Sequence, residues 1–289
     1  MLNRILTANK WWLTPFFAWM KIASVRCAAR QQGLEHLSDR LSQIVPNLED
    51  QYTTFKVDTE VLRITTRTLH AFQINLALRA IKYIANKESI FVVDIGDSSG
   101  THQRYLSTIL NNDKLFNSCD IRYLSVTLDP IAVEKIAFKS IDALLCRAED
   151  IYDKYKIKAD LLLSFEMLEH LYDPVTFLDT LSAKSVGEFF VLTVPYLSQS
   201  RVGLHHIRRQ QHLEVCPENT HIFELSPPDW KLIFQHSGWK VVEEMIYRQY
   251  PRWSFWMIMK PIWKKFDFEG FYGVILKRDR TWAECYKDN

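Results

Sequence analysis

The spacing of hydrophobic residues changes near residue 88 and divides the chain into two parts. Over residues 58–86, apolar side chains recur at intervals of seven, three and four, which predicts one long helix capped by Asp58. The positions that carry this period are Leu62, Leu69, Phe72, Leu76 and Tyr83. From residue 90 onward the chain turns to short, continuous apolar runs, beginning with 90–95 (IFVVDI). Such runs are typical of parallel strands that are covered on both faces.

Strand and helix signals alternate through the rest of the chain. After the 90–95 run, the candidate strands are 121–128, 143–146, 160–165, 189–194, 239–247 and 271–277. Helix signals lie between them, at 101–111, 131–140, 174–184 and from Ser226 to Gly238. This alternation predicts an α/β fold with a doubly wound, Rossmann-like sheet. Residues 248–269 show no clear crossover helix, so we expect the last two strands to pair antiparallel.

The same pattern predicts the domain organisation. We expect residues 1–88 to form a helical extension or lid, and residues 89–289 to form an α/β domain with insertions at 196–220 and 248–269. The five cysteines are scattered without a C-x-x-C pair, which disfavours disulfides or structural zinc and favours a reduced, cytoplasmic location. No apolar run reaches the ~18 residues of a membrane span. The apolar run 11–20 is closed by Lys21 and lacks a cleavage pattern, so we do not expect a signal peptide.

Charge is distributed unevenly along the 289 residues, although the formal net charge is only +2. Residues 1–30 and 248–265 each carry five cations and no acid, and together they hold six of the nine tryptophans. The rest of the chain has 26 basic and 34 acidic residues, a net charge of −8. Mixed aromatic and basic side chains suit a membrane–water interface or stacking on RNA, and such segments can also pack on the domain as a lid. Because the body is acidic, we expect packing as a lid or peripheral membrane contact through 11–20 and 251–266, the two being equally favoured, rather than nucleic-acid binding.

A glycine-containing turn follows the first predicted strand, at the position where doubly wound sheets bind ligands. The turn contains Asp94, Gly96, Asp97, Ser98 and Gly100. Glycines permit a tight turn and close approach of a ligand, and the amides that open the next helix can receive a carboxylate or phosphate. The dinucleotide fingerprint would need glycine at positions 98 and 101, so nicotinamide binding is disfavoured.

Acidic residues stand after the later strands in the same way. Asp129 follows the second strand, where a carboxylate can accept both hydroxyls of a ribose. Ala148 and Glu149 follow the third strand. Glu166, at the end of the fourth, begins a Glu-x-x-Glu-His sequence.

In order and spacing, these segments resemble the class I S-adenosylmethionine-dependent methyltransferases over about residues 88–278. The motifs that carry the resemblance are VVDIGDSSG (92–100), RAED (147–150), DLLLSFEMLEHLYDP (160–174), GEFFVLTVPY (187–196) and YGVILKR (272–278). The resemblance implies a seven-stranded sheet with an antiparallel last strand, and S-adenosylmethionine as cofactor. The residues that it implies for cofactor binding are Asp94, Gly96, Asp97, Ser98, Gly100, Asp129, Ala148 and Glu149. Ser98 departs from the family pattern, where glycine is usual, and Asp97 stands where a smaller residue is common.

The Glu-x-x-Glu-His sequence is the candidate for catalysis. If the chain turns helical after the fourth strand, Glu166, Glu169 and His170 share a face, and two carboxylates with an imidazole can ligate a divalent ion. Ubiquinone-pathway O-methyltransferases and small-RNA 2′-O-methyltransferases are similar here. In the RNA enzymes a further histidine completes a metal site, and His221 of the HIFE segment resembles it. If a divalent metal (Mg, Mn or Zn) binds, these four residues would hold it. Alternatively, the cluster lines the cofactor pocket and binds no metal.

The resemblance therefore predicts a methyltransferase that uses S-adenosylmethionine to methylate a hydroxyl of a small-molecule, lipid or glycan acceptor. Glu166 or His170 would bind or deprotonate that acceptor. Two alternatives stay open: a metal-dependent RNA 2′-O-methyltransferase, and a non-catalytic binding module with the methyltransferase fold.

Overall fold

The computed structural model describes residues 14–53, 55–113, 116, 119–202, 221–266 and 269–286. Within them, seven strands form one mixed sheet in the order β3-β2-β1-β4-β5-β9-β8. The strands are β1 (Ser89–Ile95), β2 (Asp120–Thr127), β3 (Ala143–Leu145), β4 (Ala159–Phe165), β5 (Gly187–Tyr196), β8 (Trp239–Arg248) and β9 (Gly270–Arg278). Strands β1 to β5 pair in parallel, whereas β9 runs antiparallel to both of its neighbours, β5 and β8. The predicted doubly wound sheet with an antiparallel last strand is confirmed.

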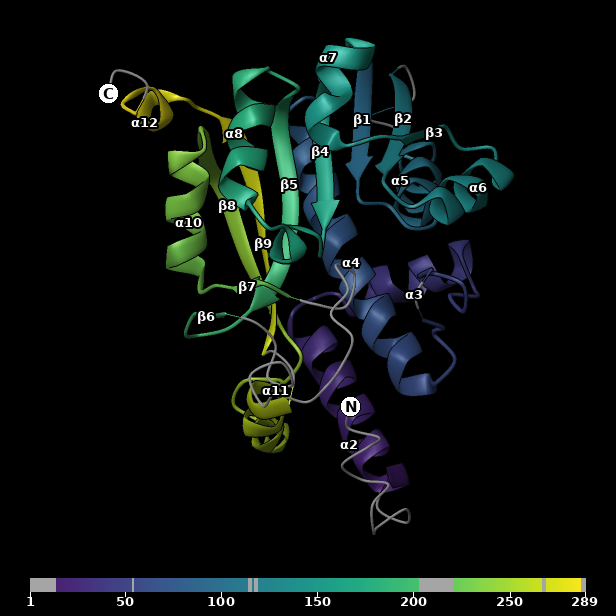
Figure 1. Ribbon diagram of the computed structural model, residues 1–289. Helices are drawn as coiled ribbons and strands as arrows, with labels where there is room; N and C mark the ends of the chain where they lie inside the picture. The colour runs from purple at the N-terminus through teal and green to yellow at the C-terminus, as the bar shows by residue number, and fades with distance from the viewer. Residues whose placement is uncertain are drawn as a thin grey trace.

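Helices lie on both faces of this sheet (Figure 1). The longer ones are α2 (Thr14–Gln31), α3 (Glu35–Ile44), α4 (Glu60–Lys82), α5 (Thr101–Leu110), α6 (Pro130–Phe138), α8 (Pro174–Ala183) and α10 (Pro227–His236). The shorter ones are α7 (Ile151–Tyr155), α11 (Lys260–Phe266), α12 (Thr281–Glu284) and the 3-10 turns η3 (Ala148–Asp150), η4 (Leu168–His170) and η5 (Phe255–Met259). A second, two-stranded sheet pairs β6 (Arg201–Val202) with β7 (Phe223–Glu224).

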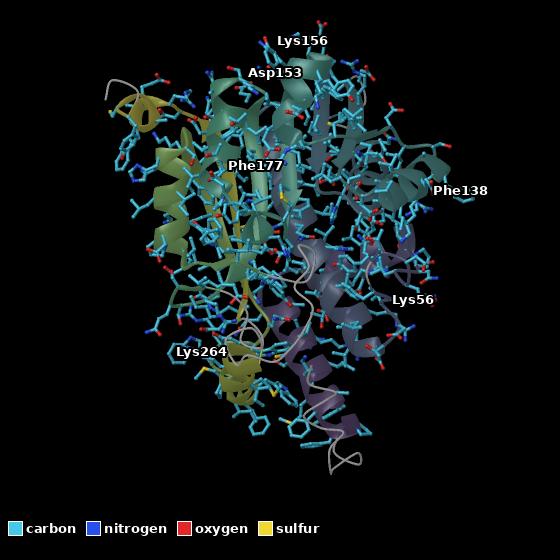
Figure 2. All side chains as sticks on the ribbon, viewed as in Figure 1. Lys56, Phe138, Asp153, Lys156, Phe177 and Lys264 are labelled. Atoms are coloured by element: carbon cyan, nitrogen blue, oxygen red, sulfur yellow. The ribbon has the colours of Figure 1, made fainter. Side chains whose placement is uncertain are left out.

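Alternate residues of each central strand belong to two different cores, because successive side chains point to opposite faces of a sheet. Leu161 and Leu163 pack into the core shared with α4 and α5, whereas Leu162 packs into the core shared with α8 and α10. Figure 2 shows Phe177 of α8 directed into this second layer, while Phe138 at the end of α6 projects into solvent. Continuous apolar runs in the sequence thus correspond to strands that are covered on both faces.

Helix α4 differs at both ends from its prediction. Its cap is Thr59, whose hydroxyl accepts a hydrogen bond from the Leu62 amide at 3.2 Å, rather than Asp58. The helix ends at Lys82, and the predicted periodic positions Leu62 and Tyr83 are exposed. Packing against the sheet determines which residues of α4 are buried. The helix lies so close to β9 that a Cβ at Gly273 would collide with Leu76.

The N-terminal helices share the core of the sheet. Residues of α3 and α4 belong to the same hydrophobic cluster as β1, β4 and β5, and α2 packs against α4 and η5. The boundary at residue 88 and the insertions stay predictions, and most of the 196–220 insertion lies outside the described residues. Among the described helices, none has both the length and the apolar character needed to cross a membrane.

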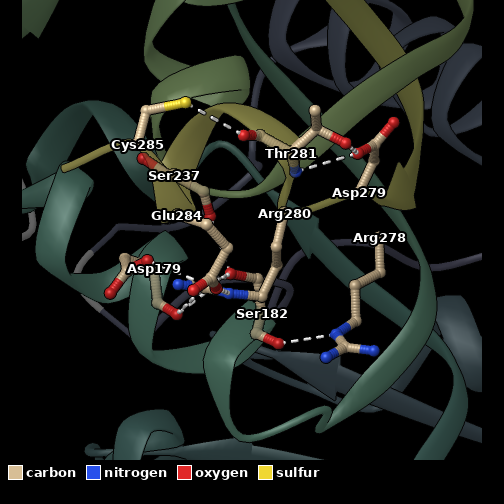
Figure 3. A network of polar contacts seen from close by, with 9 residues as sticks. All are labelled: Asp179, Ser182, Ser237, Arg278, Asp279, Arg280, Thr281, Glu284 and Cys285. Carbon is tan, nitrogen blue, oxygen red and sulfur yellow. Dashed lines mark hydrogen bonds and ion pairs between the residues drawn. The ribbon is translucent and has the colours of Figure 1, made fainter. Parts of the chain in front are cut away.

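Polar contacts fix the C-terminal end of the described chain. Arg280 donates from Nη1 to the Asp179 carboxylate at 2.8 Å, and Arg278 donates from Nε to the Ser182 carbonyl at 2.7 Å (Figure 3). Both acceptors belong to α8, so these bonds anchor α12 at the edge of the sheet away from the site described below.

Candidate active site

The carboxyl ends of β1, β2, β3 and β4 meet at one edge of the sheet because these strands run in parallel. In Figure 1 the arrowheads of β1 and β4 point toward the end of the molecule where α2 and α3 lie. The predicted residues at these strand ends, including Asp94, Asp129, Ala148 and Glu166, are therefore gathered at this edge. The N-terminal helices close the same edge from the side.

The turn after β1 requires glycine at two positions. Gly96 and Gly100 have φ angles of +84° and +70°, in the left-handed region that favours glycine. A Cβ at Gly100 would lie 2.8 Å from Cδ1 of Ile141, and a Cβ at Gly96 would lie 3.0 Å from Cγ of Met167. The turn is therefore packed closely against the segment between α6 and β3 and against the residues after β4, so neither glycine could be replaced without displacing them.

Asp97 builds this turn from within. Its carboxylate accepts hydrogen bonds from the amides of Ser99 (3.0 Å) and Gly100 (2.9 Å) and from the Ser125 hydroxyl (2.6 Å), and the residue is buried. The two amides just before α5 are thus already satisfied by this chain and do not offer themselves to a ligand carboxylate. Asp97 positions the turn, and its predicted direct contact with a cofactor stays a prediction.

Ser98, the departure from the family pattern, points toward the N-terminal region. Its hydroxyl donates to the Gln51 carbonyl at 2.9 Å. This bond joins the turn after β1 to the segment between α3 and α4. The serine side chain is therefore held by the extension.

Asp94 begins a buried chain of polar side chains. Its Oδ2 atom lies 3.3 Å from Nδ1 of His102, and the His102 Nε2 atom lies 3.2 Å from Oε1 of Gln73. Gln73 in turn donates to the Thr193 hydroxyl at 3.2 Å. Burial, reinforced by the charge of Asp97, raises the pKa of Asp94 to about 6. Burial opposes the charged form of His102, but the Asp94 carboxylate outweighs it and raises the pKa of the imidazole.

The residues predicted to hold the ribose and adenine lie at the ends of β2 and β3. Asp129 is half-buried and caps α6, accepting a hydrogen bond from the Ile131 amide at 2.8 Å. Ala148 is buried at the start of η3. Glu149 pairs with Arg147 at 2.9 Å. Both segments stand at the predicted edge, and their contacts with a cofactor stay predictions.

The local structure of the Glu-x-x-Glu-His sequence differs from the expected helical turn. Glu166 has a φ of +52°, and η4 begins only at Leu168, so Glu166 does not share a helix face with Glu169 and His170. The expectation was wrong because Glu166 still pairs with β5: its amide donates to the Thr193 carbonyl at 3.0 Å, directly after the last parallel pair of β4 and β5. A left-handed backbone at a residue other than glycine costs on the order of 1–3 kcal/mol and is concentrated at functional sites.

Three glutamates bury their carboxylates around this turn. Glu166 Oε1 and both oxygens of Glu169 have no hydrogen-bond partner among the described residues, and Glu169 and Glu224 are fully buried. Burial raises the pKa of Glu166 to about 8. Burial and the neighbouring charges of Glu166 and Glu224 raise the pKa of Glu169 far above its usual value. Carboxyl groups with a raised pKa hold their proton at neutral pH, and once ionised they are stronger bases than an ordinary carboxylate.

Three of the four predicted metal ligands lie together. One atom each of Glu169, His170 and His221 lie within 4.8 Å of one another, whereas Glu166 is outside this group. His221 Nδ1 lies 2.8 Å from Glu224 Oε1, which fixes the ring in the way that second carboxylates fix metal-bound histidines. The donor set of one carboxylate and two imidazoles suits a borderline divalent ion.

Sequence reasoning missed the network behind Asp94. The sequence pattern singles out none of His102, Gln73 and Ser125. The available signal was the position of His102 in the first turn of the helix after the glycine turn, which directs its ring back toward β1. Gln73 gave no such signal, because its contact depends on how α4 crosses the sheet.

Comparison with known proteins agrees with this geometry. Residues 69–244, more than half of the chain, match the family described as "methyltransferase domain". A search of curated proteins found no match.

The solved structures that are similar to the chain share little of its sequence. They include the [4+2]-cyclase SpnF, at 9% identity and a TM-score of 0.50, which covers 89% of this chain and 97% of that one. The 1,6-didemethyltoxoflavin-N1-methyltransferase of Burkholderia thailandensis, bound to S-adenosylhomocysteine, has 11% identity and a TM-score of 0.48, covering 71% and 77%. An S-adenosylmethionine-dependent methyltransferase of Clostridium acetobutylicum has 8% identity and a TM-score of 0.46, covering 72% and 91%. At such identities the likeness shows the fold alone.

The family match and the sheet order together define the class of protein. The chain belongs to the methyltransferase-domain family, and it is an S-adenosylmethionine-dependent methyltransferase.

Proposed function

We propose that the enzyme transfers the methyl group to a hydroxyl of a small-molecule, lipid or glycan acceptor. The observation that carries this proposal is Glu166, which the strained turn after β4 holds at the ligand edge with an unpartnered, buried carboxylate oxygen. A carboxylate with a raised pKa is a suitable base for a hydroxyl proton.

The residues present fit S-adenosylmethionine. Gly96 and Gly100 give the turn after β1 the positive φ angles of a tight strand-to-helix turn, and Asp94 offers a buried carboxylate beside it. Asp129 stands half-exposed at the end of β2, where a ribose is expected. Because Asp97 occupies the amides of Ser99 and Gly100, the carboxylate of the ligand would have to bind elsewhere at this edge.

When bound, S-adenosylmethionine supplies an electrophilic methyl group on a sulfonium. As the acceptor oxygen forms its bond to this carbon, the carbon–sulfur bond breaks and its electron pair stays on sulfur. Glu166 or His170 takes the hydroxyl proton, so that charge balances. Positioning of the two reactants supplies most of the acceleration, which the rigid turn and the N-terminal helices favour.

The cluster of Glu169, His170 and His221 favours a second form of the mechanism. A divalent ion there would bind the acceptor hydroxyl and lower its pKa, as the predicted RNA 2′-O-methyltransferase alternative requires. We keep this alternative because both Glu169 oxygens lack a hydrogen-bond partner in the described structure.

We further propose that the enzyme approaches its acceptor at a membrane surface. Exposed aromatic and aliphatic side chains of α2, of η5 and of the segment just before η5 form an aromatic tip, which comprises Phe16, Trp19, Trp253, Phe255, Met257 and Ile258. The two segments pack together, since Trp19 and Trp256 stack edge to face at 5.3 Å, and Val25, Met259 and Trp263 share a small core. The two segments are therefore partly packed against each other, and the side chains that stay exposed can contact a bilayer. Trp11 and Trp12 lie outside the described residues.

Calorimetry with S-adenosylhomocysteine tests the cofactor, and methyl transfer from labelled S-adenosylmethionine to hydroxyl acceptors tests the reaction. We expect binding, and label in a base-stable ether. Absence of S-adenosylhomocysteine binding at the highest ligand concentration tested would support the non-catalytic alternative. Transfer of label only to nitrogen or sulfur acceptors would overturn the hydroxyl assignment but not the methyltransferase activity.

A further inference from the structure

A pocket of about 310 Å³ lies where β5 ends and the segment after β8 begins. Its walls include three aromatic rings, those of Tyr196, Tyr250 and Trp253, and three cationic side chains, those of Arg248, Arg252 and Lys260. None of these residues belongs to the glycine turn or to the Glu-x-x-Glu-His cluster.

Two of the three cations lie against aromatic rings. The Arg248 guanidinium lies 5.2 Å from the ring centroid of Tyr196, and the Lys260 ammonium lies 6.0 Å from that of Tyr250. Within the described part of the chain, no carboxylate forms an ion pair with Arg248, Arg252 or Lys260. Three positive charges thus line one pocket without a protein counter-charge paired to them.

The acid that also lines the pocket is already engaged. Glu269 is buried, and its two oxygens accept hydrogen bonds from the Ser198 hydroxyl (2.9 Å) and the Tyr250 hydroxyl (2.8 Å). The Glu269 amide donates to the Tyr196 carbonyl at 3.0 Å, which ties this wall to the end of β5. Glu269 thereby fixes the Tyr250 ring under Lys260, and the pocket keeps an excess of positive charge.

The pocket lies within reach of the proposed catalytic edge. Thr193, whose carbonyl accepts from the Glu166 amide, precedes Tyr196 by three residues on β5. At ~3.3 Å per residue, the two positions are roughly 10 Å apart along the strand. A ligand with an anionic group in the pocket and a hydroxyl near Glu166 must therefore span roughly 10 Å, the scale of a sugar ring together with its phosphate linkage.

We propose that this pocket binds a phosphate group of the acceptor, so that the substrate is a phosphorylated sugar or the same headgroup carried on a lipid. Arginine forks and a lysine ammonium match phosphate oxygens in geometry and charge. The aromatic walls accommodate the apolar face of a sugar ring. This inference rests on the proposed function, since it names the class of acceptor that the same site would methylate.

The test is phosphate binding by calorimetry, without methyl transfer. The double variant Arg252→Gln/Lys260→Gln removes two exposed cations of the pocket, and Arg248→Gln tests the third separately. The control is Lys264→Gln, an exposed cation on the outer side of α11 that does not line the pocket (Figure 2). The probes are inorganic phosphate, a hexose phosphate and dihexanoyl phosphatidic acid, with dihexanoyl phosphatidylcholine as the zwitterionic comparison of zero net charge.

We expect the wild-type enzyme and Lys264→Gln to bind inorganic phosphate, and the double variant to bind it at least about tenfold more weakly. Pocket-dependent binding of the hexose phosphate indicates a soluble acceptor, and pocket-dependent binding of the phosphatidic acid indicates a lipid-linked one. The proposal is overturned if the wild type binds none of the anionic probes, or if the double variant binds them as tightly. Unchanged S-adenosylhomocysteine binding by the same variants separates that outcome from failure of the proposed function.

Discussion

The Nδ1 atom of His102 lies 3.3 Å from the Oδ2 atom of Asp94, and this contact joins the first turn of α5 to the end of β1. Because His102 also contacts Gln73 of α4, the charge state of Asp94 is tied to the N-terminal helices as well as to the glycine turn. The acid that the family resemblance assigns to the cofactor is therefore part of a buried network.

This contact predicts a pH dependence of ligand binding. Burial places the pKa of Asp94 at about 6, so the group is ionised above that pH and neutral below it. An ionised carboxylate attracts the ammonium group of S-adenosylhomocysteine, and we expect affinity to fall as the pH drops from about 8 to about 5. Calorimetry across this range checks it. In Asp94→Asn the affinity should be weaker and nearly flat with pH, and a variant with the wild-type profile would contradict the assignment.

Asp97 should be a determinant of stability. Asp97→Ala leaves two amides and the Ser125 hydroxyl without their acceptor in a buried turn, and each unsatisfied buried group costs about 1–3 kcal/mol. We expect the free energy of unfolding to fall by roughly 2–5 kcal/mol in urea titrations. Asp97→Asn keeps one carbonyl oxygen and should lose less. The exposed Asp39→Ala is the control, and equal losses in the two alanine variants would be inconsistent with this role.

Much of the fold could be predicted from the sequence because the strands are covered on both faces. A continuous apolar run bounded by turn residues has few other solutions, and the strand ends then place Asp94, Asp129 and Glu166 at one edge. Asp129 follows β2 closely and caps α6, so this one residue marks both the carboxyl end of the strand and the start of the helix.

The details of the site depended on tertiary contacts that no local pattern records. Glu166 left the predicted helix because its amide pairs with β5, a strand more than twenty residues later in the chain. Gln73 reaches Thr193 only because α4 crosses the sheet, and Ser98 bonds to Gln51 only because the extension lies beside the turn. These are contacts between distant segments.

Glu166 should act in catalysis rather than in cofactor binding. In Glu166→Gln we expect kcat to fall by about 10²–10⁴, the usual contribution of a general base, while the affinity for S-adenosylhomocysteine changes little. Steady-state rates with calorimetry on the same protein separate the two effects. Glu188→Gln, which alters an exposed carboxylate on β5, is the matched control. A rate within a few-fold of the wild type would assign the proton transfer to His170.

Chelation separates the two forms of the mechanism. If an ion bound by Glu169, His170 and His221 activates the hydroxyl, EDTA should abolish methyl transfer, Mn²⁺ should restore it, and His221→Ala should bind Mn²⁺ at least about tenfold more weakly. If the cluster only lines the cofactor pocket, EDTA should leave the rate of methyl transfer unchanged and His221→Ala should lower it little. Metal content of the purified enzyme, measured against Glu149→Gln as a control carboxylate, supports one form or the other.

The aromatic tip should bind anionic bilayers. Trp253 is 91% exposed with a φ of +56°, a strained conformation that keeps a large ring in water, while Trp19 is 56% exposed beside Phe16. Aromatic rings gain free energy at the headgroup boundary, and nearby Lys264 adds attraction to anionic lipid. In flotation assays we expect retention on vesicles of phosphatidylcholine with phosphatidylglycerol, weaker retention at high salt, and loss in Trp19→Ser/Trp253→Ser. Trp282→Ser, also exposed but on α12, should float like the wild type. Retention that is indifferent to the tip variant, or binding to RNA instead of vesicles, would show that this face serves another partner.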